Sequence, residues 1–378
     1  MSTRIRFAAA GTAALAAAGL VAAGPATAAT PHARPAVHAV FVQTDNPHGN
    51  AVVAYRSGAH GRLVKAGTYR TGGRGGVLDG SVVDHLASQG SLALDSAHQR
   101  LYAVNAGSNT ITVFAVDGTH LRRLQTLHSG GSFPVSIAVH GSLVYVLNAR
   151  NGGSVQGFLR EHGRLHRIPV WRRTLGLDAH ATPEFVTTPG QIAFSPDGTR
   201  LVVTTKANGN AIDVFQVDGS RGLSARPVVT TDAGNVPFAV TFTSANQFAL
   251  AEAGDNAVAT YRLTRSGAAK LVARSATGQA ATCWIVGVGR HVYLSNAGSG
   301  TLSSYFVPAT GAPHSEGTTA TDAGTVDAAI PAGRRYLYVQ TGAKGIVDEY
   351  AIGKHGALTR IGRVTVPGAV GGEGIVAD

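Results

Sequence analysis

Seven residues of this 378-residue chain occupy equivalent positions in a sequence repeat, where the inner strand of each repeat is predicted to begin, and several of them carry reactive side chains. The seven are Ser91, Ser136, Gln191, Ala239, Trp284, Asp327 and Glu373. Asp327 and Glu373 are the predicted catalytic residues, because two neighbouring carboxylates raise each other's proton affinity and bring a general base toward neutral pH. Either carboxylate could then deprotonate a water molecule that attacks a carbonyl carbon.

The other polar members of the set are predicted to contact a ligand. Gln191 and Ser136 could stabilise a developing oxyanion, Ser91 adds a third polar contact, and Trp284 offers an aromatic face for stacking. A structural role is the alternative for Glu373, because a carboxylate near the end of the sequence can simply accept hydrogen bonds from backbone N–H groups.

The recurring phrase itself predicts the fold. It reads as an apolar strand, a Gly/Asn turn and a second strand, as in LYAVNAGSNTITVFAVDG from Leu101, and its copies begin at residues 40, 101, 144, 201, 248, 292 and 337. Most of the spacings lie between 43 and 47 residues, which is typical of a four-stranded propeller blade. Because one further strand precedes each phrase and another follows it, we predict an all-β, seven-bladed β-propeller of four-stranded antiparallel blades.

The ends of the sequence complete the ring in this prediction. The first copy lacks its leading strand, whereas a surplus strand, residues 373–376, follows the last copy. We expect this surplus strand to be the inner strand of a blade whose other three strands lie within Val37–Tyr69, which would remove the free sheet edges. The seven aligned residues are predicted to surround one mouth of the central channel, and two insertions, Thr71–Gln89 and roughly Val170–Thr188, lead into this mouth and could form its rim.

Residues 1–29 have the pattern of a signal peptide that is removed on export. Arg4 and Arg6 precede an uncharged apolar stretch, and Ala26-Thr27-Ala28 has the small-x-small cleavage pattern. We therefore expect a secreted protein whose mature part, residues 30–378, is a single propeller domain. No later segment is long and apolar enough to be a predicted membrane span.

Charge and cysteine usage restrict the classes of partner. The net charge is +11, and the densest basic cluster is Arg160, Arg164, Arg167, Arg172 and Arg173. This cluster could bind an anionic cell-wall polymer, or it could be an ordinary solvated face. Nucleic acid is not expected, because no aromatic residues are interleaved with the basic ones.

The only cysteine, Cys283, is expected to be a small buried hydrophobe. Because no metal-binding or phosphate-binding motif is present, we expect neither a metal nor a cofactor. A monomer is also expected.

Three phrases resemble the β-propeller lactonase family, which includes bacterial 6-phosphogluconolactonases and carboxymuconate-cyclase-like proteins. They are PGQIAFSPDGTRLVVTT, NAGSNTITVF and PVSIAVHGSLVYVLN, and the resemblance runs from about residue 37 to the end. It implies a seven-bladed propeller that acts on a lactone ring at the axial mouth. The family's Pro-Arg-His segment reads Pro189-Gly190-Gln191 here, so the expected cation and imidazole are missing. Hydrolysis of 6-phosphogluconolactone itself is therefore not expected.

Two hypotheses of different classes follow from the sequence. The chain is either a secreted enzyme that opens or closes a lactone ring, or a non-catalytic extracellular propeller. In the second case it would bind a glycan, a small molecule or a protein at the cell surface. Fold alone does not decide between them.

Overall fold

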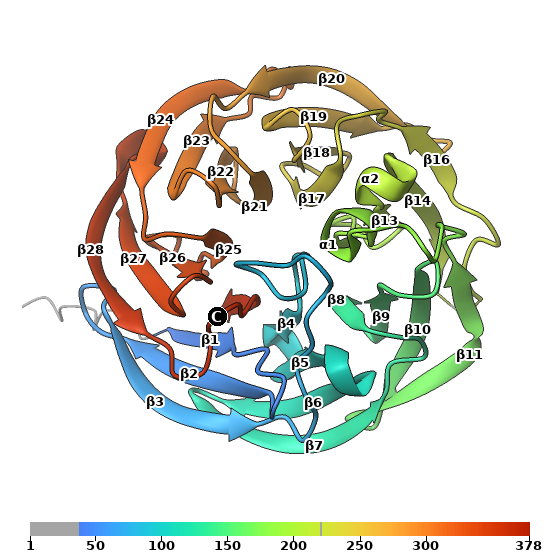
Figure 1. Ribbon diagram of the computed structural model, residues 1–378, viewed down its shortest axis with the longest axis horizontal. Coiled ribbons are helices and arrows are strands. Elements are labelled where there is room, and N and C mark those ends of the chain that lie inside the picture. Colours follow the sequence, from blue (N-terminus) through green and yellow to red (C-terminus); the bar gives the residue numbers. More distant parts are fainter. Residues whose placement is uncertain (1–37, 220) are drawn as a thin grey trace, which may run out of the picture. The chain divides into compact units, whose positions relative to one another are not determined.

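The computed structural model describes residues 38–219 and 221–378, which belong to the unit Ala36–Asp378. In this unit seven antiparallel sheets surround a common axis, as Figure 1 shows. The predicted seven-bladed propeller is thereby confirmed. The predicted signal peptide lies outside the described residues. Among the described residues, no helix has the length and apolar character needed to cross a membrane.

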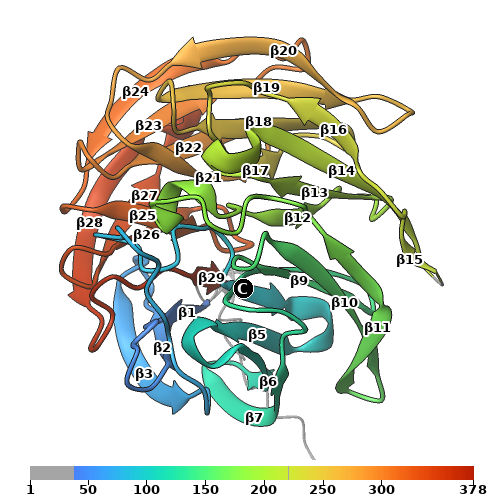
Figure 2. The same cartoon turned by 45° about the vertical axis from the view of Figure 1, so that its right-hand side comes forward.

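Each blade runs from an inner strand beside the axis to an outer strand at the rim (Figures 1 and 2). The inner strands are β29 (Ile375–Ala377), β4 (Leu92–Asp95), β8 (Pro134–His140), β12 (Ile192–Phe194), β17 (Pro237–Phe242), β21 (Thr282–Val288) and β25 (Thr325–Ala329). The second strands are β1 (Ala39–Gln43), β5 (Arg100–Asn105), β9 (Leu143–Asn148), β13 (Arg200–Thr204), β18 (Gln247–Glu252), β22 (His291–Asn296) and β26 (Tyr336–Thr341).

The third and outer strands complete the blades. The third strands are β2 (Ala51–Ser57), β6 (Thr110–Asp117), β10 (Ser154–Glu161), β14 (Ala211–Asp218), β19 (Ala257–Leu263), β23 (Thr301–Phe306) and β27 (Ile346–Ile352). The outer strands are β3 (Leu63–Arg70), β7 (His120–His128), β11 (Arg164–Thr174), β20 (Ala269–Ala276), β24 (His314–Ala320) and β28 (Leu358–Thr365). In the β12 blade, two short strands pair with β14 instead: β15 (Gly222–Leu223) and β16 (Val228–Thr231). The short helices are α1 (Glu184–Thr187) and α2 (Lys206–Gly209), and single 3₁₀ turns span Ser96–His98, Ala106–Ser108 and Lys354–Gly356.

The hydrophobic core lies between neighbouring blades, which explains why the second and third strands are apolar on both faces. Phe41 of β1 packs with Leu101 of β5 and Phe114 of β6, across the boundary between two blades. Val53 of β2 and Tyr338 of β26 share another such cluster. Outer strands are more exposed to solvent: along β3 only Leu63 is buried, and exposed and half-buried residues alternate from residue 66 to residue 70.

The ring closes as predicted from the two ends of the sequence. Strand β29 pairs with β1 in antiparallel register, with Phe41 opposite Val376 and Val42 opposite Ile375. The resulting sheet has the order β29-β1-β2-β3. The hydrogen bond from the Asp378 N–H to the Ala39 carbonyl (3.1 Å) extends this pairing.

The second insertion begins later than predicted. Val170 belongs to strand β11, and the connection to β12 starts only after Thr174. The strand continues through a bulge opposite β10, which places Trp171 in the core stacked on Tyr145. The insertion is therefore residues 175–191.

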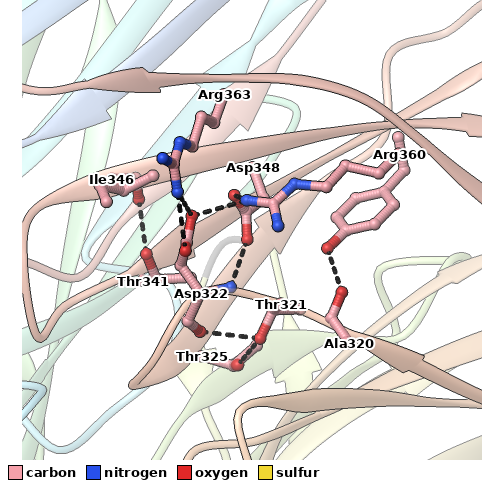
Figure 3. Close-up of polar contacts among 10 residues, drawn as sticks. Ala320, Thr321, Asp322, Thr325, Thr341, Ile346, Asp348, Arg360 and Arg363 are labelled. Atoms are coloured by element: carbon pink, nitrogen blue, oxygen red, sulfur yellow. Dashed lines mark hydrogen bonds and ion pairs between the residues drawn. The ribbon is translucent and has the colours of Figure 1, made fainter.

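Ion pairs at the rim join blades to one another and account for several buried charges. In Figure 3, Asp322, which follows β24, meets Arg363 of β28, with an Nη1–Oδ1 distance of 3.0 Å. Arg360 bridges Asp322 and Asp348, and the Asp322 N–H donates to Asp348 at 2.7 Å. Every charged group of this network has an internal partner, so we assign the network to the packing of the β21 blade against the β25 blade.

Candidate functional site

The first insertion crosses the axial mouth of the ring. We call residues 71–91, between β3 and β4, the hub insertion; Figure 1 shows this light-blue segment reaching over the inner strands. Backbone hydrogen bonds hold it on opposite sides of the axis: His85 N–H donates to Gly371 (2.8 Å), and Gln89 N–H donates to Gly190 (3.1 Å). The mouth that the sequence predicted to be rimmed by this segment is therefore largely covered by it.

A salt bridge between Arg150, which follows β9, and Glu184 of the second insertion also accepts a hydrogen bond from the hub insertion and donates one to it. Arg150 contacts both carboxylate oxygens of Glu184, at 2.6 and 2.7 Å, and the Asp79 N–H donates to the same carboxylate at 2.9 Å. Arg150 also stacks over the ring of Phe133, with its guanidinium carbon 4.3 Å from the ring centre. Bidentate geometry and the stacking make this a well-ordered contact.

All six predicted site residues are buried, and one of them, Ser91, is the last residue of the hub insertion. The Ser91 hydroxyl donates to the Glu373 carbonyl (2.8 Å), and the Ser136 hydroxyl donates to the Gln89 carbonyl (2.7 Å). The Trp284 indole N–H donates to the Ser88 carbonyl at 2.7 Å.

Four of these side chains connect successive blades. The Ser136 hydroxyl accepts from Ile192 N–H (3.2 Å), and the Gln191 amide oxygen accepts from Val240 N–H (2.6 Å). In the same sense, Asp327 accepts from Ile375 N–H at 3.3 Å, and Glu373 accepts from Gly90 N–H at 2.9 Å. The edge of an inner strand that faces the axis has no partner strand, and these side chains satisfy N–H groups along it. This part of the ring therefore has a structural role.

At Ala239 the side chain cannot accept a hydrogen bond from the next blade, and a residue of the hub insertion accepts it instead. Alanine cannot accept a hydrogen bond, so the N–H of Ile285 in the next blade bonds instead to the side-chain oxygen of Gln89 (2.9 Å). The Gln89 amide nitrogen also donates to the Ile285 carbonyl at 2.8 Å. The insertion is thus an integral part of the hub.

Three carboxyl groups lie within electrostatic range of Glu373: Asp84 of the hub insertion, Asp45 and Asp327. Burial raises the pKa of Asp45 to about 8, that of Asp327 to about 7 and that of Asp84 to about 6. Burial and the three neighbouring carboxylates raise the pKa of Glu373 well above its usual range. The Glu373 N–H donates to Asp45 at 2.8 Å, whereas Oε2 of Glu373 has no hydrogen-bond partner among the described residues.

One of these carboxyl groups, that of Asp84, lines a cavity that we call the hub cavity. The cavity has a volume of about 150 Å³ and lies between the hub insertion, the two short helices and the inner strands β17 and β21. Its larger lining residues are Val83, Asp84, Phe185, Lys206, Phe238 and Trp284. Both oxygens of Asp84 accept backbone N–H groups, from Leu86 at 2.8 Å and from Ser88 at 3.0 Å.

Lys206 is the cationic residue of the cavity wall. Its ammonium donates to the Ala87 and Phe185 carbonyls (2.7 Å each) and to the Thr188 hydroxyl (3.2 Å), so it joins the hub insertion to the second insertion. Burial lowers the pKa of Lys206 to about 7, although the nearby Asp84 carboxylate acts in the opposite direction. Its backbone is left-handed, with φ of 48°.

Three residues around the cavity were not predicted from the sequence: Asp45, Asp84 and Lys206. Asp84 lies in an insertion that the repeat does not align. Asp45 and Lys206, however, both follow the second strand of a blade, at a repeat position that elsewhere holds only alanine or glycine: Ala106, Ala149, Ala253, Ala297 and Gly342. Charged residues at two copies of a position that is otherwise alanine or glycine could have identified Asp45 and Lys206 as candidate site residues.

Cys283 also lines the cavity, beside Trp284. Burial raises the pKa of its thiol to about 12, so the thiol stays protonated near neutral pH and is not an activated nucleophile. Among the described residues, no group of three or more His, Cys, Asp or Glu side chains is arranged to hold a metal ion.

Gly190 stands where the resembled family has arginine. A side chain there would meet the Phe238 carbonyl oxygen, which lies 2.4 Å from the position of a Cβ atom. The close approach of the β17 blade therefore requires glycine. No arginine lines the cavity.

The predicted basic cluster is smaller than its five arginines suggest. Arg173 donates to the Ser224 carbonyl (2.8 Å), and Arg160 lies 3.8 Å from Asp95. The three exposed members, Arg164, Arg167 and Arg172, lie on β11. Binding of an anionic polymer to this strand stays a prediction.

Part of the chain is similar to a known protein family. Residues 49–170 match the family described as "Lactonase, 7-bladed beta-propeller". This segment runs from just before β2 into β11. No curated protein matches the chain.

Solved structures share the fold over most of the chain. One is a candidate 6-phosphogluconolactonase from Bacteroides fragilis, with 17% identity, a TM-score of 0.74, and coverage of 92% of this chain and 99% of that one. A protein from Lactobacillus plantarum has 20% identity and a TM-score of 0.72, with coverage of 90% and 98%. The periplasmic gluconolactonase of Pseudomonas aeruginosa has 17% identity and a TM-score of 0.72, with coverage of 90% and 99%. Identities this low show similarity of fold.

If Lys206 holds the two insertions together, Lys206→Met should loosen them. Two buried carbonyls would lose their donor, and each unsatisfied group costs about 1–3 kcal/mol. We expect a lower melting temperature and faster backbone amide exchange in residues 78–90, measured by mass spectrometry. Lys270→Met, at an exposed lysine of β20, is the matched control. Unchanged exchange in residues 78–90 of the Lys206→Met protein would show that other contacts hold the insertion.

Proposed function

We propose that this protein hydrolyses a small lactone bound in the hub cavity. One observation carries the proposal: the hub cavity is mostly apolar and contains a carboxyl group, Asp84, whose pKa of about 6 suits a general base near neutral pH. The match of residues 49–170 to a lactonase family supports the choice of a lactone. In line with the sequence analysis, we propose that the protein acts after export, as a monomer.

In the proposed reaction, the Asp84 carboxylate takes a proton from a water molecule as its oxygen attacks the carbonyl carbon of the lactone. The ring C–O bond then breaks, the leaving oxygen takes up the proton, and the product is an open hydroxy acid. Asp327 and Glu373, the predicted catalytic pair, interact electrostatically with Asp84. We propose that they act through Asp84, by setting the charge around it.

The test is hydrolysis of a panel of lactones at neutral pH. The wild-type rate should rise with pH through an apparent pKa near 6, and Asp84→Asn should lower kcat/KM by about 10²–10⁴-fold. Glu373→Gln and Asp327→Asn should mainly shift the pH profile. Asp79→Asn, at an exposed carboxylate of the same insertion, is the control. A wild-type protein that leaves every lactone intact would contradict the proposal, as would full activity of the Asp84→Asn protein.

A binding protein without catalysis is the second candidate, and one observation favours it. All three N–H groups of the Lys206 ammonium and both oxygens of Asp84 already bond to the protein, as structural groups do. This candidate predicts saturable ligand binding in the cavity without turnover. A glycan is the weaker ligand class for it, because the cavity wall is mostly apolar.

A further inference from the structure

The composition of the hub cavity bears on the class of ligand it accepts. Its walls are built from valine, phenylalanine and alanine side chains and the indole of Trp284. The rings of Phe238 and Trp284 meet edge to face, with centres 5.0 Å apart, and form one rigid aromatic wall. The side chains of Ser81, Asp84, Lys206 and Cys283 are the polar part of the lining.

Those polar groups have little hydrogen-bonding capacity left for a ligand. The Lys206 ammonium uses three donors on protein oxygens, and each oxygen of Asp84 already accepts one backbone N–H. A ligand rich in hydroxyl groups would leave several of them unpaired, at a cost of about 1–3 kcal/mol for each buried group. A phosphate would need cationic donors, and no arginine or histidine lines the cavity.

The entrance is apolar as well. Val82, at the tip of the hub insertion, lines the cavity although 83% of the residue is exposed to solvent. Because one side chain reaches both solvent and the cavity, the cavity opens beside Val82. An exposed valine at the opening of an apolar cavity is typical of a site that admits apolar molecules.

The size of the cavity limits the ligand. A volume of about 150 Å³ matches the engineered apolar cavity known to admit benzene, so one ring of a ligand fits inside and the rest must extend through the opening beside Val82. Ala253 and Ala297, which follow β18 and β22, form part of the wall. Larger residues at these two positions would fill the cavity, so they are candidate specificity-determining residues.

We propose that the ligand of the hub cavity is an uncharged lactone with a compact alkyl or aryl substituent, and not a phosphorylated or polyhydroxylated one. The lactone part of this inference rests on the proposed function. The apolar part rests on the cavity walls, the occupied polar groups and the exposed Val82.

The experiment separates binding from turnover. The probe is 3-phenylcyclopentanone, a carbocyclic ketone that cannot be hydrolysed, and the comparison ligands are 1,5-anhydroglucitol and its 6-phosphate. Binding is followed by the fluorescence of Trp284 and by calorimetry. The only other tryptophan, Trp171, does not line the cavity and gives a constant background. We expect saturable binding of the ketone, and at least tenfold weaker binding of both polyols.

Ala297→Leu should weaken ketone binding at least tenfold, because the added atoms occupy the cavity. Ala253→Leu provides a second test if the first variant is unstable, and Ala309→Leu, at an exposed site outside the cavity, is the control. Absence of ketone binding, equal binding of the polyols, or unchanged binding by both cavity variants would overturn the inference.

Turnover is measured separately with γ-phenyl-γ-butyrolactone. If the ketone binds in the cavity but this lactone is not opened, the apolar ligand class stands and the proposed hydrolysis is wrong. If instead a polyhydroxylated lactone is opened while the ketone does not bind, the hydrolysis stands and the ligand class is wrong.

Discussion

A protein that lacks residues 372–378 should lose most of its stability. The deletion removes β29, so β1 loses its partner strand and two neighbouring blades lose part of their shared core. Burial of Ile375 alone is worth about 1.5–3 kcal/mol, and the backbone pairing and the contacts of Glu373 are lost as well. Since whole domains are stable by about 5–15 kcal/mol, we expect insoluble protein or a melting temperature lower by tens of degrees.

Point substitutions keep this prediction testable if the truncated chain does not fold. Ile375→Ala, at a buried position of β29, should cost about 2–5 kcal/mol in chemical denaturation. Val370→Ser is the control, because this nearby valine is 60% exposed, and its effect should stay within about 0.5 kcal/mol. Near-native melting of the truncated protein would contradict a ring held closed by β29.

The second large effect concerns pH. The folded protein should be less stable at pH 7 than at pH 5, because its buried carboxyl groups keep their protons where those of the unfolded chain have lost them. The pKa of Asp45 is raised from its usual value of 3.8 to about 8, that of Asp327 to about 7, and that of Glu373 also rises. A raised pKa gives stability that is fully present below about pH 4 and is lost as pH rises toward the folded-state value.

Two other buried groups act in the opposite direction. Burial lowers the pKa of Lys206 to about 7 and also lowers the pKa of His85, so the unfolded chain holds the extra proton and stability rises with pH. The contribution of Lys206 falls mainly above pH 7. The decline due to the carboxyl groups should therefore be clearest between pH 5 and pH 7.

Asp45→Asn isolates one group of this cluster. Asparagine resembles the protonated acid, and its oxygen can still accept the Glu373 N–H. The side-chain oxygen of Gln43, which has no partner among the described residues, can accept the new amide N–H after the Gln43 amide flips. Relative to wild type, the variant should gain about 1 kcal/mol for each pH unit between 5 and 7, measured by urea denaturation.

Asp197→Asn is the control for the pH experiment, because hydrogen bonds from Ser195 and Thr199 lower the pKa of this exposed carboxylate. Its ionisation is complete well below pH 5, so the stability difference from wild type should not change with pH over this range. A wild-type protein whose stability is flat or increasing from pH 5 to pH 7, with the same slope in the Asp45→Asn variant, would refute the assignment.

The fold could be predicted from the sequence because each blade repeats the same pattern of strands and turns. A phrase such as LYAVNAGSNTITVF encodes two strands and their turn with few long-range contacts, and seven copies leave little freedom in how they assemble. The pairing of β29 with β1 was predictable for the same reason, since a missing strand and a surplus strand complement one another.

The hub was only partly predictable. Repeat alignment brought Ser136, Gln191, Asp327 and Glu373 to the axis, but it could not show that their oxygens meet N–H groups of the next blade. That outcome depends on distances between blades. The course of the hub insertion could not be predicted either. The segment is rich in glycine and is not part of the repeat, so it has no periodic pattern from which its structure could be inferred. The cavity and Asp84 belong to that segment.

The pairing of Gln89 with the gap at Ala239 has a consequence for engineering and for descent. This insertion could not be grafted by itself into another propeller. The recipient would also need a residue like Ala239, whose side chain does not accept a hydrogen bond, so that the N–H group of the next blade is left to donate to Gln89. Conversely, a relative with serine or glutamine in place of Ala239 would not need Gln89 to accept this N–H group. Its hub insertion could then differ in length and course. The two positions should therefore change together among homologues.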